Sequence, residues 1–169
     1  MDDELRRDLL SMAEADQDFR RRWASLSQDE VREEIEKEHA RSKSTADLIA
    51  AHGWPGRSLV GDDGANAAGL LIQHADHDVD LQERCLELLE AAVADGEASP
   101  RNLAYLTDRV CVNRGRRQIY GSQFHGSGSS FGPRPIDDPE RLDERRASVG
   151  LEPFAHYEAR MHEINEHSG

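Results

Sequence analysis

The stretch LIQHADHDVDLQERC, residues 71–85, places two histidines and three aspartates within seven positions of an otherwise apolar helical pattern. If the preceding apolar helix continues through it, Leu70, His74 and His77 share one face and His74 points inward. A buried imidazole can act as a general acid or base near neutral pH, or bind a metal. The competing interpretation is a core histidine at a helix end, followed by aspartates that cap the next helix.

A metal site would use His74 and His77, with Asp80 or the distant His125 completing the ligand shell. This spacing is weak evidence, because metalloprotease helices carry histidines at i and i+4 with an intervening glutamate. Two cysteines without CxxC spacing also argue against structural zinc. We therefore predict no metal, keep His74 and His77 as a weak alternative, and leave the cofactor unknown.

Other nucleophiles receive little support from the sequence. Cys85 and Cys111 lie in apolar helical patterns, where a thiol is usually an inert core residue. No GxSxG motif follows a strand, so a serine hydrolase is not indicated. The GSGSS segment at 126–130 lacks the lysine of a phosphate-binding P-loop and is typical of a flexible linker.

Two further polar segments could contact a ligand. Asp108 and Arg109 interrupt an apolar helix, and a buried arginine needs a carboxylate from the protein or from a ligand. The structural alternative is that Asp108 and Arg109 are solvated, or that they form an ion pair that holds two helices together. In RRQIYGSQF, strand alternation would put Gln118, Tyr120 and Ser122 on one polar face.

The elements that must position these residues are predominantly helical. An amphipathic helix runs from Leu5 to Trp23 with one polar gap at Asp16. Ser27 and Glu30 form a capping-box signature for a second, charged helix that reaches His52. Further helices are expected at 64–72, which is the most apolar, and then at 81–96, 100–115, 138–150 and 154–164.

The stretch 117–136 is rich in Gly, Ser and Pro, which predicts an irregular loop or a small β-hairpin. The predicted fold is thus all-α, a compact bundle of six or seven helices in a single domain spanning residues 1–169. A loop of this length in a small domain is more often functional or mobile than idle.

Composition limits the class of protein. The chain has 169 residues, a charged fraction of 33% and no apolar run of the ~20 residues needed to span a bilayer. Its N-terminus lacks a signal-peptide pattern, so we expect a cytoplasmic protein without membrane contact. A net charge of −13 argues against nucleic acid as a partner, because that affinity depends on Lys and Arg.

Four motifs in order resemble an uncharacterised bacterial family known only as a domain of unknown function: Trp54 to Gly56, Gln73 to Asp76, Asp108 with Arg109, and Gln118 to Gln123. The resemblance covers about residues 50–157, which leaves the charged helices of residues 1–50 outside a family-like core at 51–157. Ser122 stands where many relatives are expected to have threonine. The resemblance implies no reaction, but it groups these polar positions into one set.

We therefore hypothesise an enzyme or ligand-binding domain for a small molecule or peptide, with one polar pocket. His74 would be its general acid or base, Asp108 would orient His74 or hold a substrate amine, and Arg109 would bind a carboxylate or phosphate. The remaining positioning residues would be Gln73, Gln118, Tyr120 and Gln123. Segment 126–132 could act as a lid.

The alternative hypothesis is a non-catalytic helical module that binds a protein partner. Gln118 and Tyr120 would then cap backbone groups of the loop at 116–136, and Arg109 would hold that loop through an ion pair. Both hypotheses remain open at this point, and so does whether the protein is an enzyme.

Overall fold

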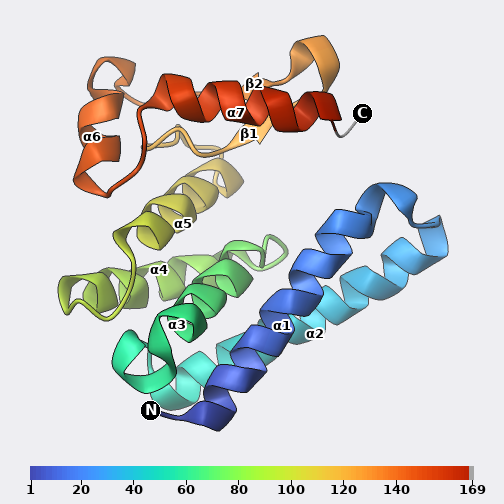
Figure 1. Ribbon diagram of the computed structural model, residues 1–169, viewed down its shortest axis with the longest axis vertical. Coiled ribbons are helices and arrows are strands. Elements are labelled where there is room, and N and C mark those ends of the chain that lie inside the picture. Colours follow the sequence, from blue (N-terminus) through green and yellow to red (C-terminus); the bar gives the residue numbers. More distant parts are fainter. Residues whose placement is uncertain (168–169) are drawn as a thin grey trace. The chain divides into compact units, whose positions relative to one another are not determined.

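The structure, a computed structural model, describes residues 1–167 and divides into two compact units, residues 1–102 and 103–169. Within the described residues there are seven α-helices, three short 3₁₀ turns and two strands of two residues each (Figure 1). The predicted all-α fold with a small hairpin is therefore confirmed. None of these helices is long and apolar enough to cross a membrane.

The first unit starts with a helical hairpin made of α1 (Asp3–Arg22) and α2 (Gln28–His52), which run alongside each other (Figure 1). The predicted capping box is present, since the Ser27 side chain accepts from Glu30 N and the Glu30 side chain accepts from Ser27 N. The helix ends at Gly53, whose φ of 73° lies in the left-handed region. A short 3₁₀ turn, Trp23–Ser25, joins the two helices.

The core of the first unit lies mainly between α1 and α3 (Arg57–Gln73). Helix α3 is the strongly buried helix that its composition predicts, although it begins earlier, at Arg57. The Glu97 carboxylate accepts from Ser58 N and so satisfies the start of the helix. Gly56 is required there, because a Cβ would lie 2.5 Å from Glu97 Oε2. The buried core consists of Leu5, Leu9, Ala13, Val60, Ala65, Ala67, Ala68 and Leu71.

Helix α3 stops at Gln73, so the condition under which His74 and His77 would share one helical face is not met, and His74 lies at a helix end as in the competing interpretation. The fully buried Gln82 of α4 (Val79–Ala94) explains the end, because its Nε2 donates to the carbonyls of Ile72 and Gln73. Asp78 then caps α4 by accepting from Leu81 N at 2.8 Å. His74 therefore takes the C-cap position of α3.

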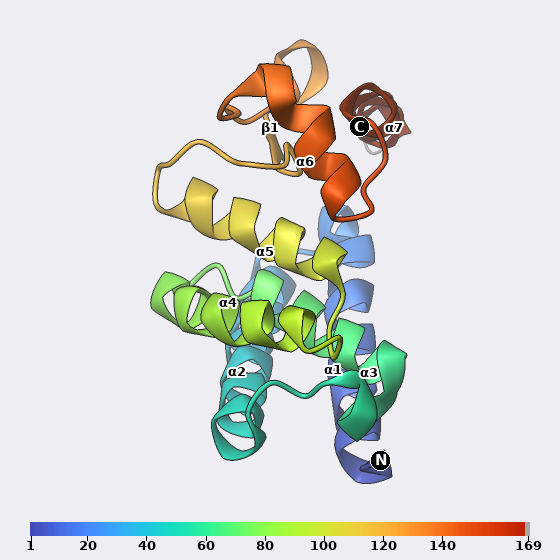
Figure 2. The same ribbon diagram turned by 90° about the vertical axis from the view of Figure 1, so that its left-hand side faces the viewer.

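Helix α5 (Pro100–Asn113) begins in the first unit and continues into the second. It ends at Gly115, with Arg116 N donating to Cys111 O in a Schellman motif, as its sequence predicts. The strands β1 (Phe124–His125) and β2 (Gly132–Pro133) form the small antiparallel hairpin. Helices α6 (Leu142–Ser148) and α7 (Phe154–His167) complete this unit (Figure 2).

The predicted helix start at Asp138-Pro139 needs correction. Asp138 adopts a left-handed φ of 39° and its side chain makes no capping hydrogen bond, so Pro139–Arg141 forms only a 3₁₀ turn before α6. The Asp138 carboxylate instead lies 3.8 Å from Arg145.

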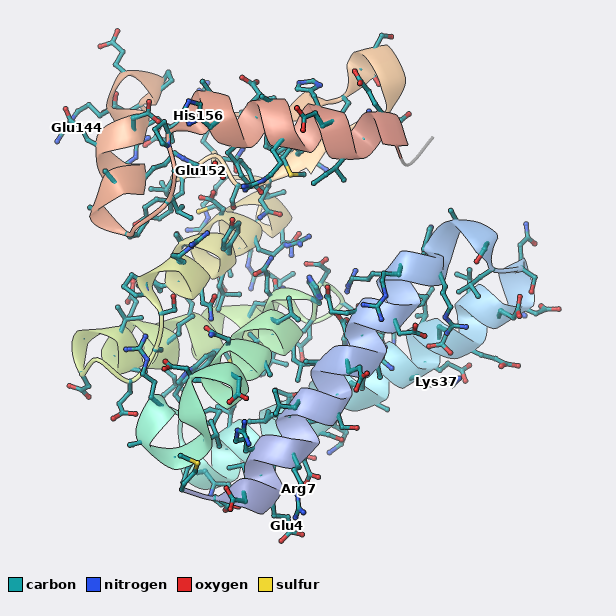
Figure 3. All side chains as sticks on the ribbon, in the orientation of Figure 1. Glu4, Arg7, Lys37, Glu144, Glu152 and His156 are labelled. Atoms are coloured by element: carbon teal, nitrogen blue, oxygen red, sulfur yellow. The ribbon has the colours of Figure 1, made fainter. Side chains whose placement is uncertain are left out.

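The charged residues mostly point outward, as the composition predicts. Glu4 and Arg7 project from α1, Lys37 from α2, and Glu144 from α6 (Figure 3). A charged side chain that is buried therefore stands out against this pattern and calls for a specific partner.

Candidate functional site

The polar gap in the apolar stripe of α1 is a buried carboxylate. Asp16 is only 1% exposed, and its Oδ2 lies 2.7 Å from Nδ1 of His74, which caps α3. The helix end thus places the imidazole against α1, 58 residues away in the sequence. The first unit brings an aspartate and a histidine together as an acid-base pair.

Arg20 and Glu38 extend this pair toward the surface. Arg20 donates from Nε to Asp16 Oδ2 at 3.2 Å and from Nη2 to Glu38 Oε1 at 2.7 Å. Burial by itself raises the pKa of Asp16, but hydrogen bonds and charges from His74 and Arg20 outweigh it and hold this pKa well below its usual range. Asp16 is therefore a fixed negative charge beside the imidazole at neutral pH.

This charge determines which nitrogen of His74 carries the hydrogen when the ring is neutral. A carboxylate oxygen 2.7 Å away can only accept, so Nδ1 must donate to Asp16. The Arg20 Nε–H, 2.9 Å from the same nitrogen, is then directed to the carboxylate. Nε2 is left with its lone pair, and within residues 1–167 no hydrogen bond to it is found. A nitrogen in this state can accept a proton from a bound molecule.

The pair lies at the wall of a cavity of about 290 Å³ that is formed entirely by the first unit. Phe19, Trp23 and Ile35 supply apolar wall, while His74 and Glu38 supply polar groups. Six of the nine lining residues are polar or ionisable, so the lining is more polar than that of most small-molecule sites, and the volume is at the lower end of their range.

Two further histidines face this cavity. The rings of His39 and His77 lie 3.9 Å apart between centroids and are tilted by 31°. Burial lowers the pKa of His77, and the charge of His39 lowers it further, against smaller opposing effects from Glu38, Asp78 and Asp76. Positive charge on both rings at once would therefore be unfavourable.

The residues that the structure describes contain no group of three or more His, Cys, Asp or Glu side chains placed to hold a metal ion.

Asp108, a predicted site residue, belongs to the second unit and serves a different purpose. It is fully buried on α5 and accepts hydrogen bonds from the backbone N–H groups of Ile119, Tyr120 and Ser122 at 2.7 to 2.8 Å. Burial raises the pKa of Asp108, although these three donors oppose the shift. These three hydrogen bonds come from the loop backbone, so Asp108 holds the loop in its conformation.

Gln118 and Gln123 complete this loop scaffold. Gln118 is fully buried and donates from Nε2 to the carbonyls of Gln123 and Arg134, while its Oε1 accepts from Gln123 N. The Gln123 amide donates to Ser122 Oγ at 2.9 Å. The segment is not a strand, so the predicted alternation of Gln118, Tyr120 and Ser122 on one polar face is wrong. The buried side chains of Asp108 and Gln118 form hydrogen bonds with the loop backbone of the kind that a neighbouring strand would form in a sheet.

Arg146 and Tyr157 are loop anchors that sequence reasoning missed. Arg146 is 1% exposed, donates to Tyr120 O at 2.6 Å, and lies 4.9 Å from the Tyr157 ring centroid. The Tyr157 hydroxyl donates to Ser122 O. Gly121 packs so closely that a Cβ would lie 2.9 Å from the Phe154 ring. Nothing in the local pattern at Arg146 separates it from the exposed arginines around it.

The remaining predicted residues are placed as follows. Gln73 is the last residue of α3 and lies next to the candidate cavity. Its carbonyl accepts a hydrogen bond from Gln82. Tyr120 binds Asp108 and Arg146 through its backbone. Arg109 is partly buried on α5. Gln73 and His74 belong to the first unit and the other five to the second, so their convergence on one pocket stays a prediction.

Asp16 is the residue that the sequence could have revealed. It breaks the apolar stripe of α1 at a position that must face the core, and a buried carboxylate requires a partner. The cysteines follow expectation, since burial raises the pKa of the Cys85 thiol to about 11 and keeps it unreactive.

These features define an all-α protein with a buried acid-base pair in its first unit. The sequence pattern of the family of unknown function DUF6624 matches residues 3–166, and the chain belongs to this family. The match confirms the predicted membership and extends beyond residues 50–157 to include Asp16. Comparison with curated proteins finds no match. Comparison with solved structures also finds none.

Proposed function

We propose that the first unit binds a small molecule in its histidine-lined cavity and that the Asp16–His74 pair transfers a proton with it. The observation that carries this proposal is the 2.7 Å contact between His74 Nδ1 and the buried carboxylate of Asp16, which leaves Nε2 free of that carboxylate and able to accept a proton when the ring is neutral. An aspartate that orients an imidazole in this way also stabilises the imidazolium formed when the base takes a proton.

The cavity suggests the kind of ligand. Trp23 is half exposed and offers apolar surface, and its ring lies 5.2 Å from the buried Phe19 ring between centroids, at a tilt of 59°. Arg20 is neutralised by Asp16 and Glu38, so little positive charge is left for an anion. A compact, partly apolar molecule with a hydroxyl or amide proton near Nε2 fits this chemistry better than a phosphate.

The experiment compares the parent protein with His74→Asn, against a panel of small metabolites in thermal-shift assays. Asparagine can still donate to Asp16 from its amide, but it has no counterpart of Nε2. We expect compounds that raise the melting temperature of the parent and have no effect on the variant. His156→Asn, an exposed histidine on α7, is the matched control and should behave like the parent (Figure 3). A panel in which no compound distinguishes His74→Asn from the parent would contradict the proposal.

The tautomer gives a test that needs no ligand. Two-bond nitrogen-proton NMR spectra of the histidine rings should show His74 with hydrogen on Nδ1 and an unprotonated Nε2 when the ring is neutral. A hydrogen on Nε2 would remove the proton acceptor on which the proposal depends.

A second candidate function, the non-catalytic helical module, is favoured by the second unit. There the side chains of Asp108 and Gln118 form hydrogen bonds with the loop backbone. In this account His74 only joins α3 to α1. It predicts that His74→Asn, which keeps the bond to Asp16, is equivalent to the parent in every binding assay.

A further inference from the structure

The second unit contains a cavity whose walls carry only one sign of charge. It measures about 350 Å³ and is lined by Val112, Gly115, Arg116, Arg117, Arg134 and Pro135. Three of these six residues are arginines and none is acidic, in a chain whose net charge is −13. Positive charges held this close together repel one another.

The fold brings the arginines together from two separate segments. Gly115 ends α5 and turns the chain so that Arg116 and Arg117 follow directly. Gln118 then donates to Arg134 O at 2.8 Å, and its own N–H donates to Pro135 O at 3.0 Å. The buried Gln118 thus fixes Arg117 and Arg134 on neighbouring stretches of backbone.

The side chains of these two arginines remain exposed, in contrast to their buried neighbour Gln118. Arg117 donates to the Ile136 carbonyl at 3.2 Å, which holds its guanidinium beside the second segment. Several other arginines of the chain face a carboxylate, as Arg141 faces Glu144 and Arg160 faces Glu152. Within residues 1–167, Arg117 and Arg134 form no ion pair.

We propose that this arginine cavity binds a small ligand with two or more phosphate groups. Guanidinium groups bind phosphate oxygens through paired hydrogen bonds, and arginines from two directions suit an anion with several charges. A cavity of about 350 Å³ is within the range of small-molecule sites and exceeds what a single phosphate fills. The site belongs to the second unit and is independent of the proton-transfer function proposed for the first.

The test uses isothermal titration of the full chain with inorganic pyrophosphate, and with acetate as a singly charged comparison. We expect saturable binding of one pyrophosphate per chain and no measurable binding of acetate. The double variant Arg117→Gln/Arg134→Gln should bind pyrophosphate at least about tenfold more weakly, whereas Arg141→Gln, in the same unit, should bind like the parent. Unchanged affinity in the double variant, or no saturable binding by the parent, would overturn the proposal.

Two other roles for the arginines give different results. Positive charge after the C-terminus of α5 could merely stabilise the helix dipole, and the double variant would then melt earlier without any change in pyrophosphate affinity. Nucleic acid could be the true partner. In that case a short single-stranded RNA would bind more tightly than pyrophosphate and would lose affinity in the same variant. Either result would refute a small phosphorylated ligand.

Discussion

Two buried aspartates, one in each unit, show how differently the same side chain can be used. Asp16 and Asp108 are both almost inaccessible, at 1% and 0% exposure. Asp16 faces His74 and Arg20, and these partners lower its pKa, whereas Asp108 faces three backbone N–H groups and has a raised pKa. The first carboxylate acts on another ionisable side chain, and the second determines the path of the main chain.

The difference separates a chemical role from an architectural one. A carboxylate whose partners are titratable groups beside a cavity influences proton transfer, because it changes the energy of the charged imidazole. A carboxylate whose donors are backbone N–H groups holds the main chain in place. Burial alone, which the two residues share, does not reveal function.

Replacing Asp108 should have the largest effect on stability. Asp108→Ala removes the acceptor of three buried N–H groups, and each such loss costs ~1 to 3 kcal/mol, so we expect at least about 3 kcal/mol in the free energy of unfolding. Urea denaturation measures this change. Asp137→Ala, an exposed aspartate of the same unit, is the control and should change stability little. A loss below ~1 kcal/mol would show that the loop does not depend on Asp108.

Asp16→Asn should have a smaller effect, of about 1 to 3 kcal/mol, because a charged hydrogen-bond acceptor is lost while the shape is kept. The loss of stability is smaller than for a fully buried pair, because Arg20 is partly exposed and keeps its ion pair with Glu38. Denaturation of this variant beside Asp8→Asn, an exposed aspartate on α1, measures the difference. Equal stability of the two variants would mean that the buried pair contributes nothing.

The pH dependence should distinguish the two aspartates even where stability alone does not. The lowered pKa of Asp16 gives stability that is complete above its ordinary pKa of 3.8 and is lost as the pH falls below it. Asp108, with a raised pKa, contributes with the opposite sign, since its share declines as the pH rises through its folded pKa. Between neutral pH and about pH 3, Asp16→Asn should therefore lose less stability than the parent. Parallel curves would refute the assignment.

Helix boundaries were the most predictable part of the fold, because they depend on local chemistry. The capping box of Ser27 and Glu30 and the glycines at 96, 115 and 150 end or begin helices where expected. Asp138 was misread, since the same residue types also suit a left-handed turn. The stop of α3 depends on Gln82, nine residues downstream of Gln73, and no local pattern encodes that contact.

The sequence predicts only one of the two residues of the buried pair in the candidate site. His74 was singled out by its position after an apolar helix, but its partner Asp16 lies on a helix that the motif resemblance did not reach. Pairing across 58 residues comes from tertiary packing, which spacing alone cannot supply. The resemblance also gathered Gln118 and Asp108 into the site, whereas their contacts serve the loop scaffold.

The way in which the loop at residues 118–134 is anchored has a consequence for how this family can diversify. The loop is held by side-chain hydrogen bonds to its peptide groups, from Asp108, Gln118 and Arg146. Every residue except proline has the same backbone N–H and C=O groups. Exposed side chains on the loop, such as Arg134, can therefore be exchanged without changing the path of the backbone. The second unit can therefore keep one backbone conformation while its exposed loop side chains change. New ligand preferences can evolve or be engineered in this way.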